Sequence, residues 1–289
     1  MTMLDVEYKM ERHGAKALGF DAYCDLLTRE YEALLSDDSK EEKSFQDFFE
    51  KHPCMLPIVG NINHSVLHGC LFSQPRISSA SNVRIPDFMW IASNSASLTP
   101  VFIEIERPGK MAYRKSDDVQ NAAFSQAEDQ ILEWKALLEQ EREDFFERYL
   151  IPQRLRCRKF SPFFILIYGR RREFENNEWL SLKRAMKNTS NFNLMSFDRL
   201  KPNLNLMRFP SAKRTERGIE LLHIPPTFGL GPSIAMELAE WSCLEGVISK
   251  NNYISDERKA FLQKRAAYWK EFATLDVSKR GIIRNGDWE

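Results

Sequence analysis

The segment 101–106 has the sequence Val-Phe-Ile-Glu-Ile-Glu and lies between Pro100 and Pro108. Its β-branched and aromatic residues favour extended backbone, and the two prolines bound it, so the segment predicts a strand. Glu104 and Glu106 are two residues apart and therefore point to the same side of that strand. Burying two carboxylates at the end of an apolar strand is costly unless a counter-charge accompanies them, and a metal ion would supply that charge. The alternative is a pair of solvated or salt-bridged acids at a strand end.

The segments around this strand alternate between strand-like and helix-like patterns. Short apolar runs predict further strands at 65–72, 83–91, 163–168 and 192–197. Apolar residues at helical spacing predict helices at 41–51, 116–146 and 175–187. The polar loop 93–97 is expected to join the second and third strands as a hairpin. This alternation predicts an α/β fold, with a mixed sheet flanked by helices.

The chain is expected to divide into three parts: an N-terminal helical segment (1–40), an α/β domain (41–210) and a helical C-terminal extension (211–289). The extension follows a cluster of prolines and glycines between 225 and 232, and two helices are expected in it, at 233–249 and 256–272. Their aromatic residues serve either the core or an oligomer interface, because apolar helices added to a finished domain need a surface to cover. A homo-oligomer is the expectation.

The composition says more about the cellular compartment of the protein than about its function. Lys+Arg and Asp+Glu both number 41, and a net charge of zero leaves local basic patches open. The five cysteines are widely spaced and form no CxxC pair, which indicates free thiols in a reducing compartment. The N-terminus lacks a signal-like apolar region, and no apolar run reaches about 18 residues. We therefore expect a cytoplasmic protein that does not cross a membrane.

Three motifs follow one another along the chain: Ile-Pro-Asp-Phe at 85–88, Phe-Ile-Glu-Ile-Glu-Arg-Pro at 102–108, and Gln126 with Gln130 on the long predicted helix. Together they resemble motifs of a known family, the Shedu anti-phage nuclease domain, a branch of the PD-(D/E)xK nuclease superfamily. Weaker matches are Phe-Phe-Glu-Lys-His-Pro at 48–53, Ile-Leu-Ile-Tyr-Gly-Arg at 165–170 and Phe-Asp-Arg-Leu at 197–200. The likeness covers about residues 41–202 and rests on the order of the motifs, since each alone is weak. It implies a restriction-endonuclease-like sheet.

The resemblance also implies a metal site. Asp87 and Glu104 would ligate Mg²⁺ or Mn²⁺, and the carbonyl oxygen of Ile105 would be a further ligand. Glu50, on the first helix of the domain, would complete the outer shell; the alternative is an ordinary solvated helix acid. Gln126 would face the site, or else be a surface glutamine.

One position departs from the family pattern, because Glu106 stands where the family usually has lysine. A lysine there would orient the attacking water and offset charge on the phosphate. Glu106 could instead act as a general base or a second metal ligand. Alternatively, Lys110 could reach back over the Pro108-Gly109 turn and supply the positive charge. The remaining possibility is a site that has lost cleavage.

A basic segment suggests the partner. Residues 154–172 contain several arginines and no acids, and Arg170, Arg171 and Arg172 follow the apolar strand expected at 163–168. With Arg107, these side chains could neutralise the phosphates of double-stranded DNA. The alternative is a solvated loop balanced by the acidic residues that precede it.

The sequence therefore supports three hypotheses. The first is a magnesium-dependent DNA endonuclease of the Shedu type in anti-phage defence, with water activated by metal on Asp87 and Glu104. The second is a catalytically degenerate DNA-binding or sensor module that keeps the fold. The third is an interaction protein whose acids are only structural.

Overall fold

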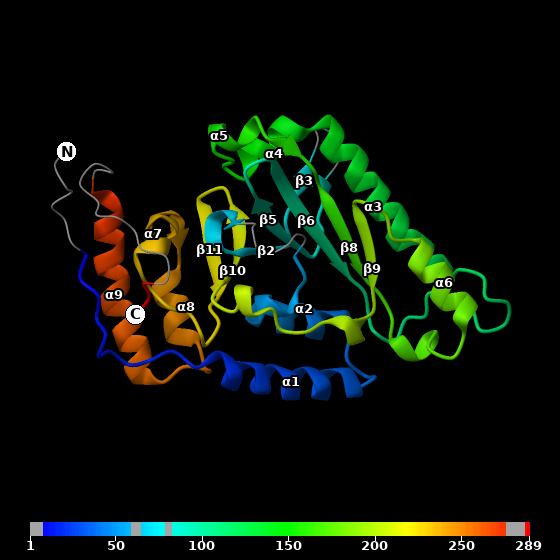
Figure 1. Cartoon of the computed structure of the whole chain (residues 1–289), viewed down its shortest axis with the longest axis horizontal. Helices are drawn as coiled ribbons and strands as arrows, with labels where there is room; N and C mark the ends of the chain where they lie inside the picture. The colour runs from blue at the N-terminus through cyan, green and yellow to red at the C-terminus, as the bar shows by residue number, and fades with distance from the viewer. Residues whose placement is uncertain (1–7, 59–64, 79–82, 276–286) are drawn as a thin grey trace.

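The computed structural model describes residues 8–58, 65–78, 83–275 and 287–289 (Figure 1). Its centre is a 10-stranded mixed sheet with the order β12-β11-β10-β2-β5-β6-β8-β9, in which β1 also pairs with β5 and β7 with β6. The strands of this sheet are β1 (Ser65–Val66), β2 (Leu71–Ser73), β5 (Phe88–Ser93), β6 (Ser97–Ile105), β7 (Lys159–Phe160), β8 (Phe163–Ile167), β9 (Phe192–Met195), β10 (Ser211–Thr215), β11 (Gly218–His223) and β12 (Trp241–Ser242). A separate two-stranded sheet pairs β3 (Ile77–Ser78) with β4 (Val83–Arg84). The expected mixed sheet is confirmed.

Helices cover both faces of the sheet. Figure 1 shows α1 and α2 on one side, α3 along the other, and α7 to α9 beside the β11 end. The helices are α1 (Phe20–Ser36), α2 (Glu42–Lys51), α3 (Ala122–Gln140), α4 (Arg142–Arg148), α5 (Gln153–Arg156), α6 (Glu178–Met186), α7 (Ala235–Glu240), α8 (Leu244–Lys250) and α9 (Asp256–Thr274). Within the described ranges, no helix combines the length and apolarity that crossing a bilayer requires.

The alternation of side chains along β6 separates two hydrophobic clusters. Ile103 and Ile105 belong to the cluster that contains the aromatic residues of α1 and α2, whereas Phe102 belongs to the cluster that contains the buried face of α3. Because side chains of a strand alternate between its faces, Glu104 lies on the α3 side with Phe102. The apolar neighbours of Glu104 therefore fix the direction of its carboxylate.

The expected hairpin is confirmed. β5 and β6 pair antiparallel, with Phe88 opposite Ile103 and Ser93 opposite Leu98. The single strand expected at 83–91 is instead two strands separated by a gap, since β4 ends at Arg84 and β5 starts only at Phe88. Pro86 lies in this gap, and a proline has no N–H to donate to a strand ladder. The strand expected at 101–106 starts earlier than predicted, at Ser97.

Two other expected elements are interrupted. The helix expected at 116–146 is two helices, α3 and α4, and its first turn is missing. Glu141 separates the two with non-helical backbone angles, φ −115° and ψ 37°. The strand expected at 65–72 is broken by a turn in which His68 has a left-handed φ of 61°. Both interruptions are backbone features that side-chain periodicity does not report.

The expected helical C-terminal extension is confirmed by α7 to α9, but the segment 211–289 begins with two strands that were not predicted. β10 and β11 form an antiparallel hairpin, and β10 joins the central sheet by pairing parallel with β2. The helix expected at 233–249 is divided into α7 and α8 by β12, and only the second expected helix, at 256–272, is confirmed as α9. The strands of the hairpin were missed because they are half polar: in β11, the buried Ile219 and Leu221 alternate with half-buried neighbours.

Candidate active site

Asp87 and Glu104 lie side by side where the gap before β5 meets the end of β6. The Ile105 N–H donates to Oδ2 of Asp87 at 2.8 Å, and the Asp87 N–H donates to Oε2 of Glu104 at 3.3 Å. The hairpin register produces this arrangement, since Phe88, next to Asp87, is paired with Ile103, next to Glu104. The structure therefore joins the two acids that the sequence proposed as metal ligands.

Both carboxyl groups belong to residues of intermediate solvent exposure and are partly buried at the strand end. Burial raises the pKa of Asp87 to about 7, although the hydrogen bond from the Ile105 amide lowers it. Burial also raises the pKa of Glu104 well above its usual value, and the charge of Asp87 raises it further. Among the described residues, neither carboxylate forms an ion pair with a basic side chain. The pair lacks a compensating positive charge, and two ionised groups in this position would repel each other.

This donor set fits Mg²⁺ better than a metal that needs a complete protein cage. In the part of the chain that the structure describes, no three His, Cys, Asp or Glu side chains are close enough to hold an ion by themselves. Mg²⁺ is commonly bound by one or two carboxylates, with waters and substrate phosphates as its remaining ligands. Asp87, Glu104 and the main chain at Ile105 match that pattern.

Lys110 contacts Glu106, the residue at the position where the family pattern has lysine. Its Nζ forms an ion pair with Oε2 of Glu106, and these side chains are 35% and 14% exposed. The turn from Arg107 to Lys110, closed by a 3.0 Å hydrogen bond from the Lys110 N–H to the Arg107 carbonyl, folds the lysine back towards β6. An ammonium group therefore stands beside Glu106, two residues beyond Glu104.

Glu42, in the first turn of α2, is an acid near the site that sequence reasoning missed. Its charge contributes to the raised pKa of Asp87, and its own pKa is raised by burial and by the charge of Glu106. Glu50 lies two turns further along α2 and accepts a 2.5 Å hydrogen bond from Ser73 Oγ. No signal in the sequence pointed to Glu42, because which turn of α2 lies near the strand end is decided by how the helix packs on the sheet.

Gln126 is not brought to the carboxylates. It is exposed on α3, whereas Phe124, Ala127 and Ile131 of the same helix are buried against the sheet. Positions 126 and 124 differ by about 200° around a helix, so the two side chains point in nearly opposite directions. The spacing of Gln126 and Gln130 was correct for one helical face, but it did not say which face covers the sheet.

The arginines proposed to contact DNA lie near the same end of β6 and β8, and several are paired there. Arg107 pairs with Glu41 at 3.1 Å and Arg172 with Asp38 at 3.1 Å; these side chains are largely exposed. Arg170 is only 20% exposed: its guanidinium lies 2.9 Å from Asp198 and donates to the Leu35 carbonyl at 2.9 Å. The Arg171 side chain is exposed, and its main-chain N–H donates to Asp198.

Comparison with known families identifies this part of the chain. Residues 39–200 match the family described as Shedu protein SduA, C-terminal, and they make up more than half of the 289 residues. The matched region contains α2, the β5–β6 hairpin, both acids of the candidate site, and β8. No curated protein matches the chain significantly. The family match covers the site and the strands that form it, and the chain therefore belongs to the Shedu family.

Proposed function

We propose that this chain is a metal-dependent DNA endonuclease of the PD-(D/E)xK type that acts in anti-phage defence. The observation that carries the proposal is the partly buried pair of Asp87 and Glu104, joined through main-chain hydrogen bonds and without a basic partner among the described residues. Such a pair is expensive to maintain unless a cation occupies it, at least during function. Family membership supports the defence role.

Each residue of the site has a proposed role in phosphodiester hydrolysis. Asp87 and Glu104 would hold Mg²⁺ or Mn²⁺, with the Ile105 carbonyl as a further oxygen ligand. When bound, the metal would polarise the phosphate and lower the pKa of a bound water. Lys110 would offset negative charge that builds up on the phosphate, and Glu106 would orient Lys110 or accept a proton from the attacking water. A phosphorus–oxygen bond to water forms as the bond to the leaving oxygen breaks.

Double-stranded DNA is the proposed substrate, and the exposed arginines at this end of the sheet are the proposed contacts. Arg107, Arg171 and Arg172 have side chains that solvent, and hence phosphate, can reach. Breaking the weak exposed ion pairs of Arg107 and Arg172 would cost about 1 kcal/mol or less each. Arg170 is better suited to a structural role, because it is half-buried between Asp198 and the Leu35 carbonyl.

Plasmid nicking and metal binding together test the proposal. The full chain is incubated with supercoiled plasmid and Mg²⁺, and Mn²⁺ binding is measured separately by calorimetry. Asp87→Asn and Glu104→Gln should each lose nicking and weaken Mn²⁺ binding, whereas Glu143→Gln, at an exposed acid on α4, should change neither. Nicking that survives both site substitutions, or that needs no divalent metal, would refute the assignment.

A second candidate is a degenerate module that binds DNA or acts as a sensor without cutting it. It is favoured by Glu106 in place of the family lysine and by the ion pair that already engages Lys110. In that case the wild-type chain would bind DNA and Mn²⁺ without nicking, and Glu106→Lys would introduce activity. If the wild type nicks and Glu106→Lys does not improve it, the first candidate stands.

A further inference from the structure

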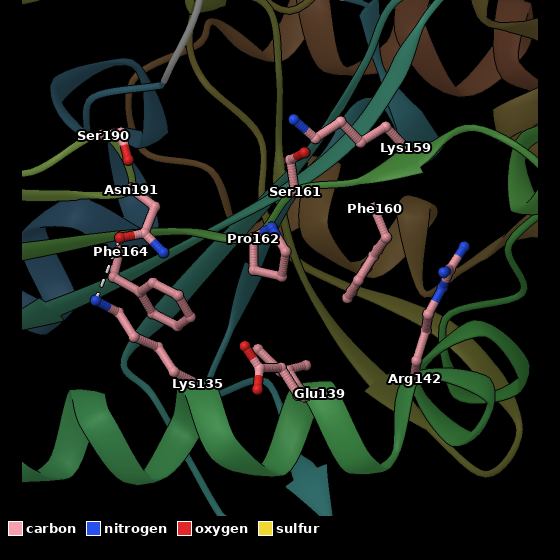
Figure 2. A pocket seen from close by; sticks show the side chains of 11 residues that line it. Lys135, Glu139, Arg142, Lys159, Phe160, Ser161, Pro162, Phe164, Ser190 and Asn191 are labelled. Carbon is pink, nitrogen blue, oxygen red and sulfur yellow. Dashed lines mark hydrogen bonds between the residues drawn. The ribbon is translucent and has the colours of Figure 1, made fainter.

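A cavity of about 530 Å³ opens between the second half of α3 and the segment that leads from β7 into β8 (Figure 2). It lies towards the start of β8, whereas Glu104 pairs with Leu166 near the end of that strand. Its volume lies within the range of about 300–1,000 Å³ that is usual for small-molecule sites. The cavity is therefore large enough for a ligand and separate from the two carboxylates.

Three basic side chains line this cavity: Lys135, Arg142 and Lys159. Figure 2 shows Lys135 and Glu139 on α3 and Arg142 just beyond the end of that helix, where α4 begins, with the other lining segments opposite them. Across the described ranges, none of the three forms an ion pair with an acid, although many other basic residues of the chain do. Glu139 is the one acidic residue that lines the cavity, so the lining carries an excess of positive charge.

Packing holds two of these basic groups in place. The Arg142 guanidinium lies 4.9 Å from the ring centre of Phe146 and 5.3 Å from that of Phe160, and it donates to the Arg156 carbonyl. Its Nε is buried and has no hydrogen-bond partner within the described residues. Lys135 lies over the Phe164 ring at 5.3 Å, and within the described ranges its one polar contact is a long one, 3.4 Å from Nζ to Oδ1 of Asn191. Basic groups that packing holds in place and that no carboxylate neutralises are typical of an anion site.

The other lining groups narrow the class of anion. Phe160, Pro162 and Phe164 give the cavity an apolar wall, and Ser161, Ser190 and Asn191 add neutral polar groups. Glu139 is exposed among the basic groups, where its carboxylate would repel a continuous phosphodiester chain but could accept hydrogen bonds from sugar hydroxyls. A free nucleotide combines these needs: a phosphate, hydroxyl donors and a flat apolar base.

We propose that this cavity binds a nucleotide, with its phosphate among Lys135, Arg142 and Lys159, its ribose hydroxyls on Glu139 and its base against the wall formed by Phe160 and Pro162. The proposal goes beyond the nuclease function and does not depend on it, because it uses none of the residues assigned to metal binding or cleavage. A nucleotide bound here would be a second ligand of the chain, one that the carboxylate pair does not recognise.

Calorimetry on the full chain tests the proposal, with AMP, ATP, inorganic phosphate and a 5′-phosphorylated single-stranded oligonucleotide as probes. AMP or ATP should bind, and the double substitution Lys135→Gln/Lys159→Gln should weaken that binding by about tenfold or more, since it removes two charge-assisted contacts. Lys201→Gln, at an exposed lysine away from the cavity, is the matched control and should leave the affinity unchanged. Glu139→Gln should weaken AMP but not inorganic phosphate.

Four outcomes would overturn the proposal: no binding of AMP or ATP, equal affinity for phosphate and AMP, binding of the oligonucleotide alone, or nucleotide binding that the double variant retains. Lys135 packs on an aromatic ring, so the double variant could lose stability. If the double variant unfolds, Lys159→Gln alone, which changes an exposed side chain, is tested instead, and it should also weaken nucleotide binding. Loss of plasmid nicking would not affect this result, because nucleotide binding is measured without DNA or metal.

Discussion

The main-chain amide of Ile105 donates a 2.8 Å hydrogen bond to the side chain of Asp87 rather than to the backbone of the neighbouring strand. If the register of the β5–β6 hairpin continued, Ile105 would face Pro86, but β5 begins only at Phe88. A carboxylate thus replaces a strand carbonyl at the end of the ladder. The consequence is that Asp87 is fixed by the backbone at the point where Glu104 projects.

Removing one charge from the acidic pair should stabilise the protein while abolishing nicking. Asp87→Asn keeps an oxygen for the Ile105 amide and relieves repulsion between two partly buried carboxylates. At pH 8 without metal, we expect it to raise the free energy of unfolding by about 1 kcal/mol or more. Thermal melting in EDTA measures this change, and Glu143→Gln serves as the exposed control.

The effect of Asp87→Asn should depend on pH in one direction. Burial raises the pKa of Asp87 to about 7, so the folded state binds its proton more tightly than the unfolded state does. The stability linked to this proton is present at low pH and lost as the pH rises through about 7. The gain from the substitution should therefore shrink at pH 5. A gain of equal size at pH 5 and pH 8 would contradict a charge-based cause.

We predict that Lys110 supplies the positive charge that the family motif usually has at the position of Glu106. Lys110→Met should reduce the rate of plasmid nicking by about 100-fold, because it removes charge stabilisation of the phosphate. Mn²⁺ affinity should change little, since the amino group is not a metal ligand. Lys201→Gln controls for the loss of a surface lysine. Full nicking activity in Lys110→Met would leave Glu106 without a functional partner.

His52 should make stability fall in mild acid. It is fully buried, with Nδ1 2.9 Å from the Tyr23 hydroxyl, and burial lowers its pKa from 6.5 to about 3. The unfolded chain then binds more protons than the folded one, so this stability is present above pH 6.5 and is lost as the pH falls towards 3. Between pH 7 and pH 5 the loss should be about 2 kcal/mol.

A variant without this titration isolates the effect of His52 from other groups. Urea unfolding of His52→Gln should show a smaller drop in the free energy of unfolding between pH 7 and pH 5 than the wild type does, even though its stability at pH 7 is lower. Exposed His13 provides the control as His13→Gln, which should keep the wild-type pH dependence. Parallel pH profiles for wild type and His52→Gln would show that His52 is not the source.

Arg170 should support the fold rather than DNA binding. Its guanidinium lies against Asp198 and the Leu35 carbonyl, so Arg170→Gln should lower the free energy of unfolding by about 1–3 kcal/mol. Arg171→Gln should leave stability unchanged, because Arg171 bonds Asp198 through its main-chain N–H. Urea unfolding measures both variants. For DNA affinity we expect the reverse order, and a larger loss of affinity in Arg170→Gln than in Arg171→Gln would contradict this assignment.

Much of the central domain follows from local patterns in the sequence. β8 was predicted from its continuous apolar run, and the hairpin joining β5 to β6 from two strand-like segments on either side of a short polar loop. The same reasoning placed Glu104 and Glu106 on one side of a strand. The family motifs added Asp87 from a segment whose local pattern says little, since Pro86 interrupts the strand there.

Local sequence patterns could not predict which other strand or helix each element packs against. β10 and β11 have a weak half-polar alternation and become strands because they extend a sheet edge formed by β2, about 140 residues earlier in the chain. Likewise, Gln126 points away from the site because α3 packs against the sheet through Phe124 and Ile131. Which face of the helix is buried depends on the sheet that it covers. The position of Glu42 depends on how α2 crosses the sheet.

The sequence by itself determined the buried strand that carries Glu104, because the period-two alternation of apolar and acidic residues is a property of the chain alone. Only the tertiary structure decided the environment of that carboxylate. Its raised pKa, the closeness of Asp87 and the contact of Lys110 with Glu106 depend on burial and on distances between segments, and these are set when the strands and helices pack together.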